Sequence, residues 1–112
     1  MFILKNNYNP KKKWHCQADN NTFSLFHKGR NFFPDAGVYA YSGDSQRNVY
    51  EQTAWHNTIT IFENNIDQML GKFIYKGTDG NTNYIVTENA AYIQKETPKS
   101  DVLNHRRSVF HV

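Results

Sequence analysis

Five side chains in the first half of the chain could take part in proton transfer or metal binding. They are His15, Gln17, Asp19, Asp35 and His56. Imidazole exchanges protons near neutral pH, and imidazole, carboxylate and amide groups all bind divalent cations. Their spacing matches neither a zinc finger nor a pair of histidines one helical turn apart. Spacing alone therefore favours ordinary roles, such as turn-forming aspartates and a partly buried structural histidine.

Short β-strands must position these side chains, because helical periodicity is almost absent. Runs rich in Phe, Tyr, Ile, Val and Thr alternate with turns rich in Asn, Gly, Asp and Pro. We expect a single partial domain over residues 1–112 with an all-β fold, an antiparallel β-sandwich. Residues 45–57 are more polar and compatible with a helical turn. The expected strands are 22–27, 31–33, 38–41, 58–63, 68–75, 84–93 and 107–112, with turns or loops at 28–31, 76–81 and 95–104.

The two ends of the chain carry further expectations. The last expected strand stops on Val112, which would leave an apolar sheet edge unpaired. We therefore expect a second chain, or the rest of a longer protein, to complete the sheet. The apolar run at residues 2–4 lacks the features of a signal peptide, and no segment has the ~20 apolar residues of a membrane helix. The single cysteine, Cys16, excludes an internal disulfide.

Charge and aromatic content limit the classes of partner without identifying one. The formal net charge is +3, and 15% of the residues are aromatic, which argues for a folded domain with large units of burial. A charge this small tolerates an anionic partner. The lysine run at 11–13 is most simply a solvated loop, although lysine also suits sulfate or carboxylate groups. It lies far from the basic pair at 106–107, and no nucleic-acid-binding motif is present, so we expect no nucleic-acid partner.

The order of the motifs around the five side chains changes their interpretation. Residues 14–41 follow the pattern WHxxADNxxFxLxxxGRNxxxDxGxYxY, and the motifs RNxY and HNT follow at 47–50 and 56–58. This ordered set resembles the heparinase II/III family of polysaccharide lyases. The resemblance is strongest over residues 9–61 and continues more weakly to 105–109. Within the family, the run NPKKKWHCQADN is most similar to the heparin-sulfate lyase (heparinase III) type.

The resemblance implies a fold and an activity for a larger enzyme. Family members join an N-terminal (α/α) toroid to a C-terminal antiparallel β-sandwich, the part that this chain resembles. They cleave acidic polysaccharides by β-elimination at a uronic acid, which implies a heparan sulfate-like substrate and a periplasmic or secreted enzyme. The family's catalytic tyrosine, and the group that neutralises the substrate carboxylate, come from the toroid. We therefore expect the toroid to be missing here and the chain alone to be inactive.

The resemblance also implies roles for individual residues. His15 matches the catalytic histidine of the β domain and would act as a general base or as a charge-neutralising partner. Gln17, Asp35 and His56 match the ligands of a structural divalent metal, zinc or calcium. Many members have a histidine at the position of Gln17, and the amide oxygen in its place suits a harder cation better than zinc.

Aromatic and basic residues near the expected site suggest how a substrate could be held. We expect Trp14 and Lys13 to contact the polysaccharide. Tyr39, Tyr41 and Trp55 could also stack on sugar rings, although such residues more often belong to a core. The alternative function is a non-catalytic carbohydrate-binding or structural β module, whose glycan affinity would survive the loss of the catalytic histidine.

Overall fold

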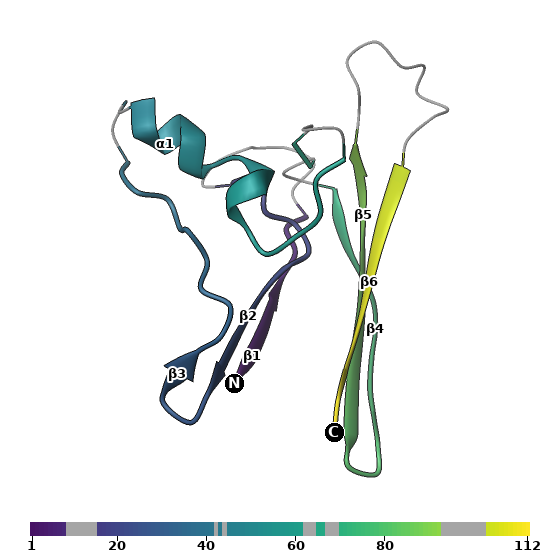
Figure 1. Cartoon of the computed structure of the whole chain (residues 1–112). Coiled ribbons are helices and arrows are strands. Elements are labelled where there is room, and N and C mark those ends of the chain that lie inside the picture. The colour runs from purple at the N-terminus through teal and green to yellow at the C-terminus, as the bar shows by residue number, and fades with distance from the viewer. Residues whose placement is uncertain (9–15, 42, 44, 62–64, 67–69, 93–102) are drawn as a thin grey trace.

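In the residues that it describes, the computed structural model of the chain contains two three-stranded antiparallel sheets, one short α-helix and one 3-10 turn (Figure 1). The strand order is β1-β2-β3 in the first sheet and β4-β5-β6 in the second. The expected all-β, antiparallel fold is therefore confirmed. The structure describes the chain except for residues 9–15, 42, 44, 62–64, 67–69 and 93–102 and the side chains of 90–92.

The first sheet is formed by β1 (Phe2–Lys5), β2 (Thr22–His27) and the short β3 (Arg30–Asn31). A two-residue turn joins β2 to β3, and both of its residues, Lys28 and Gly29, have positive φ, at 47° and 76°. This backbone suits the right-handed twist of a tight hairpin. The sequence predicted β2 with its correct bounds. The predicted turn at 28–31 is too long, because its second half is β3, and of the predicted strand at 31–33 only Asn31 belongs to a strand. The sequence did not assign a strand to β1, which pairs with β2 along its whole length.

The second sheet is formed by the longer strands β4 (Gly71–Asp79), β5 (Thr82–Tyr92) and β6 (Leu103–His111). The turn between β4 and β5 includes Gly80, whose φ is 56°. The predicted loop at 76–81 is therefore too long, because most of it continues β4 and pairs with β5. β6 also begins earlier than expected, inside the stretch that the sequence indicated as a loop.

Two further predicted strands are wrong. Residues 38–41 are not a strand, because Tyr39 has a φ of 59°, in the left-handed region that extended backbone excludes. Residues 58–60 are not a strand either. The chain bends at Thr58, whose backbone N–H donates to the carbonyl of His56 at 2.8 Å. The end of that second prediction, 62–63, falls on residues that the structure does not describe.

The polar stretch between the two sheets contains the helical turns that its composition suggested. They are α1 (Ser45–Tyr50) and the 3-10 turn η1 (Thr53–Trp55). An ion pair of 2.7 Å joins the guanidinium of Arg47 to the carboxylate of Glu51 one turn later. No helix among the described residues has the length and apolar character needed to cross a membrane.

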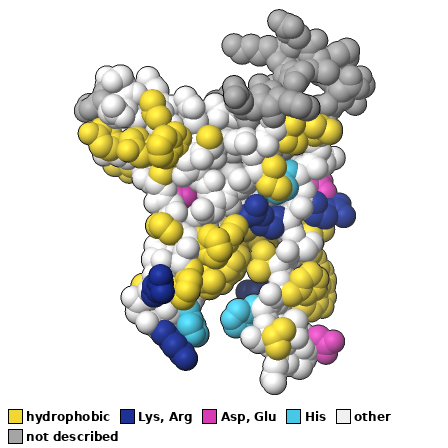
Figure 2. All heavy atoms as spheres, in the orientation of Figure 1, with side chains coloured by type: hydrophobic (Ala, Val, Ile, Leu, Met, Phe, Trp, Pro, Cys, Tyr) yellow, Lys and Arg dark blue, Asp and Glu magenta, His cyan; other side chains and the backbone are white. Residues whose placement is uncertain are grey.

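The buried interior between these elements is mostly polar. Among the described residues, the fully buried hydrophobic side chains are Ala18 and Ile66, and much apolar surface stays exposed on the face shown in Figure 2. Hydrogen bonds replace apolar packing here: the hydroxyl of Thr53 donates to the carbonyl of Ala18 at 2.7 Å and accepts from the N–H of Ile66 at 2.8 Å. Most buried polar groups in proteins are hydrogen-bonded, and bonds of this kind between separate segments fix the loops in defined positions.

His105 makes the stability of the second sheet depend on pH. It is buried on β6, and burial together with repulsion from Arg107 lowers the pKa of its imidazole. The unfolded chain, with a histidine pKa of ~6.5, then binds a proton more readily, so stability is lost as the pH falls below that value. We expect the melting temperature to drop more between about pH 7.5 and 5.5 in the wild type than in His105→Gln. Thermal unfolding followed by circular dichroism at several pH values measures the melting temperature of both proteins. An equal drop in both would contradict the role assigned to His105.

Candidate active site and metal site

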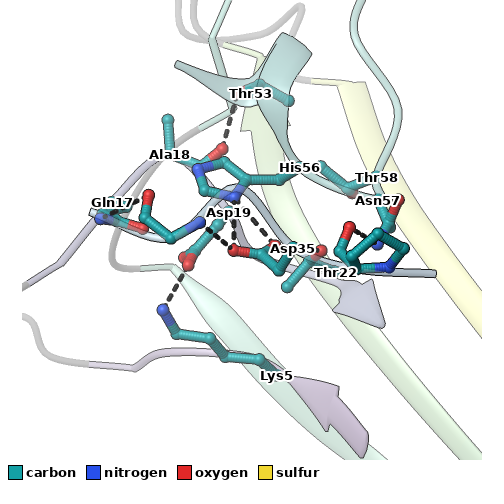
Figure 3. A network of polar contacts seen from close by, with 12 residues as sticks. Lys5, Gln17, Ala18, Asp19, Thr22, Asp35, Thr53, His56, Asn57 and Thr58 are labelled. Carbon is teal, nitrogen blue, oxygen red and sulfur yellow. Dashed lines mark hydrogen bonds and ion pairs between the residues drawn. The ribbon is translucent and has the colours of Figure 1, made fainter. Parts of the chain in front are cut away.

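Three segments that are distant in the sequence meet where Gln17, Asp35 and His56 lie (Figure 3). Gln17 stands in the segment before β2, Asp35 in the loop after β3, and His56 directly after η1. The hydrogen-bond network of the polar interior holds these segments in place. The structure thus brings together the three positions that the sequence singled out as metal ligands.

Asp35 and His56 form the centre of this site. The imidazole Nδ1 of His56 lies 3.0 and 3.1 Å from the two carboxylate oxygens of Asp35. The backbone N–H of Gly37 donates to the same carboxylate at 2.9 Å, and the Thr22 hydroxyl lies 3.4 Å from it. Partial burial acts to raise the pKa of Asp35, but these hydrogen bonds and the positive charges of His56 and Lys5 outweigh it and lower the pKa. The carboxylate is therefore ionised at neutral pH.

Gln17 joins the site through the turn that follows Asp35. Its side-chain nitrogen lies 3.4 Å from the carbonyl oxygen of Gly37, whose own N–H donates to Asp35. With the amide nitrogen directed to Gly37, the amide oxygen is the atom left to act as a ligand.

The residues present fit a divalent cation. The His56 side chain is fully buried, and its second ring nitrogen, Nε2, has no hydrogen-bond partner among the described residues. Nε2 points away from Asp35, so the atoms that face one another are the imidazole Nδ1 of His56 and the carboxylate oxygens of Asp35. With the amide of Gln17 nearby, these are nitrogen and oxygen donors of the kind that zinc and calcium accept. Within the described part of the chain, no three His, Cys, Asp or Glu side chains form a group that could hold a metal ion, so a cation at this place would need Gln17 as a third protein ligand.

A cleft of about 410 Å³ opens beside these residues. Its lining includes Gln17 and Asp35 together with two ion pairs, one between Lys5 and Asp19 and one between Arg47 and Glu51. Both cations are thus already paired, and Asp19 is almost fully buried. The cleft therefore has the mixed polar walls of a ligand site, with its cations held in place by acidic neighbours.

Three of the predicted functional residues fall outside the described residues. They are the proposed catalytic histidine, His15, and the two proposed substrate contacts, Trp14 and Lys13. Their roles stay predictions. In the sequence, His15 is separated from Gln17 by a single residue, Cys16, which lines the cleft beside Gln17.

Asn57 is the residue of the site whose role the sequence analysis missed. Its side-chain nitrogen lies 3.1 to 3.2 Å from the carbonyl oxygens of Phe23, Phe33 and Pro34. It therefore ties β2 to the loop that carries Asp35. The HNT motif contained the signal, because an amide directly after the buried histidine can hold the backbone that presents the histidine's partner.

Several aromatic side chains lie on the surface, and one of them, Tyr41, lines the cleft. Tyr39 and Tyr50 stack with ring centroids 5.4 Å apart, and Tyr50 contacts Trp55 at 5.1 Å. Tyr39, Tyr41 and Trp55 are 61%, 77% and 48% exposed, so the expectation that they belong to a core is wrong. Exposed rings of this kind are suited to stacking on a flat ligand.

The fold and the site define an antiparallel β domain whose loops hold a histidine–carboxylate pair beside a polar cleft. The family model for the heparinase II/III-like C-terminal domain matches residues 2–112. The chain therefore belongs to the heparinase II/III-like C-terminal family.

Similar proteins and structures agree with this family. A heparin-sulfate lyase from Bacteroides stercoris is 44% identical over 107 residues, which cover 92% of this chain and 15% of that protein. A heparin-sulfate lyase from Pedobacter heparinus is 38% identical over 116 residues, covering all of this chain and 16% of the relative.

The crystal structure of heparan sulfate lyase HepC from Pedobacter heparinus matches with a TM-score of 0.77 at 38% identity, over 97% of this chain and 16% of that one. A crystal structure of heparinase III matches with a TM-score of 0.79 at 39% identity, over 99% of this chain and 17% of that one. The chain thus spans about 15% of the length of the relatives it matches.

Proposed function

We propose that this chain forms part of the active site of a polysaccharide lyase that cleaves heparan sulfate-like, uronic-acid-containing glycans by β-elimination. The observation that carries the proposal is that Gln17, Asp35 and His56 meet from three separate segments. Gln17 is two residues from His15 in the sequence. The heparin-sulfate lyase names of the relatives support the class of substrate. The proposed localisation of the whole enzyme is periplasmic or secreted.

The proposed reaction divides its steps between this domain and the toroid. A base removes the C5 proton of the uronic acid, a double bond forms between C4 and C5, and the C4–O bond breaks. The departing oxygen then takes up a proton. His15 is proposed to remove the C5 proton or to neutralise the adjacent carboxylate, because the pKa of imidazole lies near working pH. The toroid is proposed to supply the tyrosine and the second neutralising group.

A divalent cation is proposed to bind to Gln17, Asp35 and His56. When bound, it supplies a positive charge that links the three segments. The chain's own groups position the site. The Asp35 carboxylate bonds to the His56 ring, and the backbone N–H of Gly37 donates to that carboxylate. The Asn57 side chain holds the backbone just before Asp35. A fixed cradle keeps neighbouring catalytic groups within a fraction of an ångström of the productive geometry.

Substrate binding is proposed to involve Trp14 and Lys13, with the exposed rings of Tyr39 and Trp55 as further contacts. Lysine suits the sulfate and carboxylate groups of such a glycan, and the rings suit the apolar faces of its sugars. The same exposure of Tyr39 and Trp55 supports the alternative function, a carbohydrate-binding module without turnover.

A chimera distinguishes the two functions. In it, this chain replaces the matching segment of the Bacteroides stercoris relative, so that the domain is joined to the rest of a heparin-sulfate lyase. We expect the chimera to raise the ultraviolet absorbance of a heparan sulfate solution, because β-elimination creates a conjugated double bond. The isolated chain should show no turnover, because its base lacks the acid on the other domain. A folded chimera that binds heparan sulfate without cleaving it would favour the binding module.

A further inference from the structure

Three aromatic rings form a row across one face of the second sheet. Tyr75 on β4, Tyr84 on β5 and Phe110 on β6 are neighbours, with centroid distances of 5.3 and 6.2 Å. The rings are nearly parallel, with interplanar angles of 26° and 23°. Tyr75 and Phe110 are 50% and 69% exposed. A row of large rings left in water marks a binding surface more often than a structural one.

A glycine makes room for this row. A Cβ atom at Gly77 would lie 2.6 Å from Cζ of Tyr84, which is too close for a real contact, and 3.0 Å from Cε1 of Tyr75, which is tight. The Tyr84 ring therefore lies across the backbone of β4 instead of standing away from the sheet. The two tyrosine hydroxyls are 3.3 Å apart, which fixes the rings relative to each other. The row is thus a flat surface, and it can form because residue 77 is a glycine with no side chain.

The row lies on the face of the sheet that is turned away from the first sheet. Side chains alternate along β6: His105 is buried and Arg107 packs over the ring of Phe23, whereas Ser108 and Phe110 are exposed. Hydrophobic side chains are visible over this sheet in the space-filling view (Figure 2). Within the described residues, nothing from the first sheet covers the aromatic row.

Basic side chains lie on the same face in a second row, further along the strands toward one end of the sheet. Lys72, Glu88 and Arg106 are cross-strand partners, and Glu88 and Arg106 lie four residues along their strands from Tyr84 and Phe110. Arg106 donates to the Glu88 carboxylate at 2.7 Å, and its side chain is 61% exposed. Two positive charges against one negative charge leave this end positive, which favours an anionic ligand. Lysine and arginine side chains are the usual contacts for sulfate and carboxylate groups.

We propose that the outer face of the β4-β5-β6 sheet is an accessory binding surface for an acidic glycan, distinct from the cleft. Tyr75, Tyr84 and Phe110 stack on the apolar faces of successive sugar rings, while Lys72 and Arg106 contact acidic groups of the same chain. The choice of an acidic glycan rests on the proposed function. The flat aromatic row and the positive end of the face are independent of it.

Calorimetric titration of the full chain with heparan sulfate oligosaccharides tests the surface. Phe110→Ala and Tyr75→Ala should each weaken binding about fivefold, because each removes one aromatic contact. Phe110→Trp should restore the affinity, since it keeps a flat ring at an exposed position. Phe32→Ala is the matched control, because Phe32 is 48% exposed on the other sheet, and it should bind as the wild type does. Dispersed amide signals in an NMR spectrum show that each variant is folded.

Three outcomes would contradict the proposal that this face binds an acidic glycan. Unchanged affinity in Phe110→Ala and Tyr75→Ala would place glycan binding elsewhere, and absence of binding by the wild-type chain would remove the glycan as the occupant. Self-association that Phe110→Ala abolishes would assign the face to a second copy of the chain. None of these results affects cleavage by the chimera, so failure of this surface is distinguishable from failure of the proposed lyase function.

Discussion

Replacing His15 by alanine in the chimera is expected to lower the rate of heparan sulfate cleavage by about 10²- to 10⁴-fold, the usual contribution of a general acid or base. The reason is chemical: no other group of this domain is proposed to accept the C5 proton or to neutralise the carboxylate beside it. Initial rates of absorbance increase under saturating substrate measure the effect. The binding constant for the polysaccharide should change little, because the remaining contacts persist.

Two controls separate catalysis from folding in that experiment. His27→Ala removes an exposed histidine at the end of β2 and should leave the rate unchanged. His15→Gln keeps a polar side chain of similar size but cannot act as a base, so it should be as inactive as the alanine variant. A His15→Ala chimera that retains most of its rate would show that the catalytic assignment is wrong.

Replacing Asp35 by asparagine is expected to cost about 2–3 kcal/mol of unfolding free energy, the range for losing a hydrogen-bonded charge beside a buried group. Asparagine has the same shape but lacks the charge that faces the buried His56 ring and the proposed cation. Urea denaturation of the chain measures the difference. Asp79→Asn is the matched control, because Asp79 is exposed at the end of β4 and should lose less than 0.5 kcal/mol, as is usual for surface sites.

Chelation turns the same variant into a test of the cation. Removing a metal that binds only the folded state lowers stability by RT ln(1 + c/Kd), where c is the free metal concentration, and this is about 2.7 kcal/mol when c is a hundred times Kd. A chelator should therefore lower the melting temperature of the wild type and leave Asp35→Asn nearly unchanged. Equal losses in both proteins would place the cation elsewhere. Absence of any loss in the wild type would mean that Asp35 and His56 act as a pair without a metal.

The sequence predicted the features of the fold that depend on local patterns. Alternation identified β2, and the glycine after it supplied the positive φ of the hairpin turn. Alternation failed at 38–41 and 58–60, where β-favouring residues lie in bent segments instead of a sheet. A strand needs a partner as well as a pattern, and the partner depends on tertiary contacts that the pattern does not contain. β1 was missed because its first three residues are all apolar, so the segment shows no alternation.

The residues of the candidate site could be predicted, but the contacts that hold them in place could not. Gln17, Asp35 and His56 came from the family resemblance, because their spacing alone favoured ordinary roles. The HNT motif marked Asn57 as a residue beside the buried histidine, but its three backbone carbonyl partners belong to segments more than 20 residues away and could not be read from the motif. The aromatic row on the second sheet was equally hidden, because its three rings come from three different strands.

The masses of the oligosaccharides that the chimera releases from heparan sulfate test the central claim most directly. β-Elimination adds no water, so each cut should leave a product with an unsaturated uronate end, lighter by one water molecule than the corresponding hydrolysis product. We expect these unsaturated products from the chimera that carries His15 and none from its His15→Ala variant. Saturated products, or unsaturated products formed equally well by both proteins, would contradict the claim that this chain supplies a catalytic group to a polysaccharide lyase.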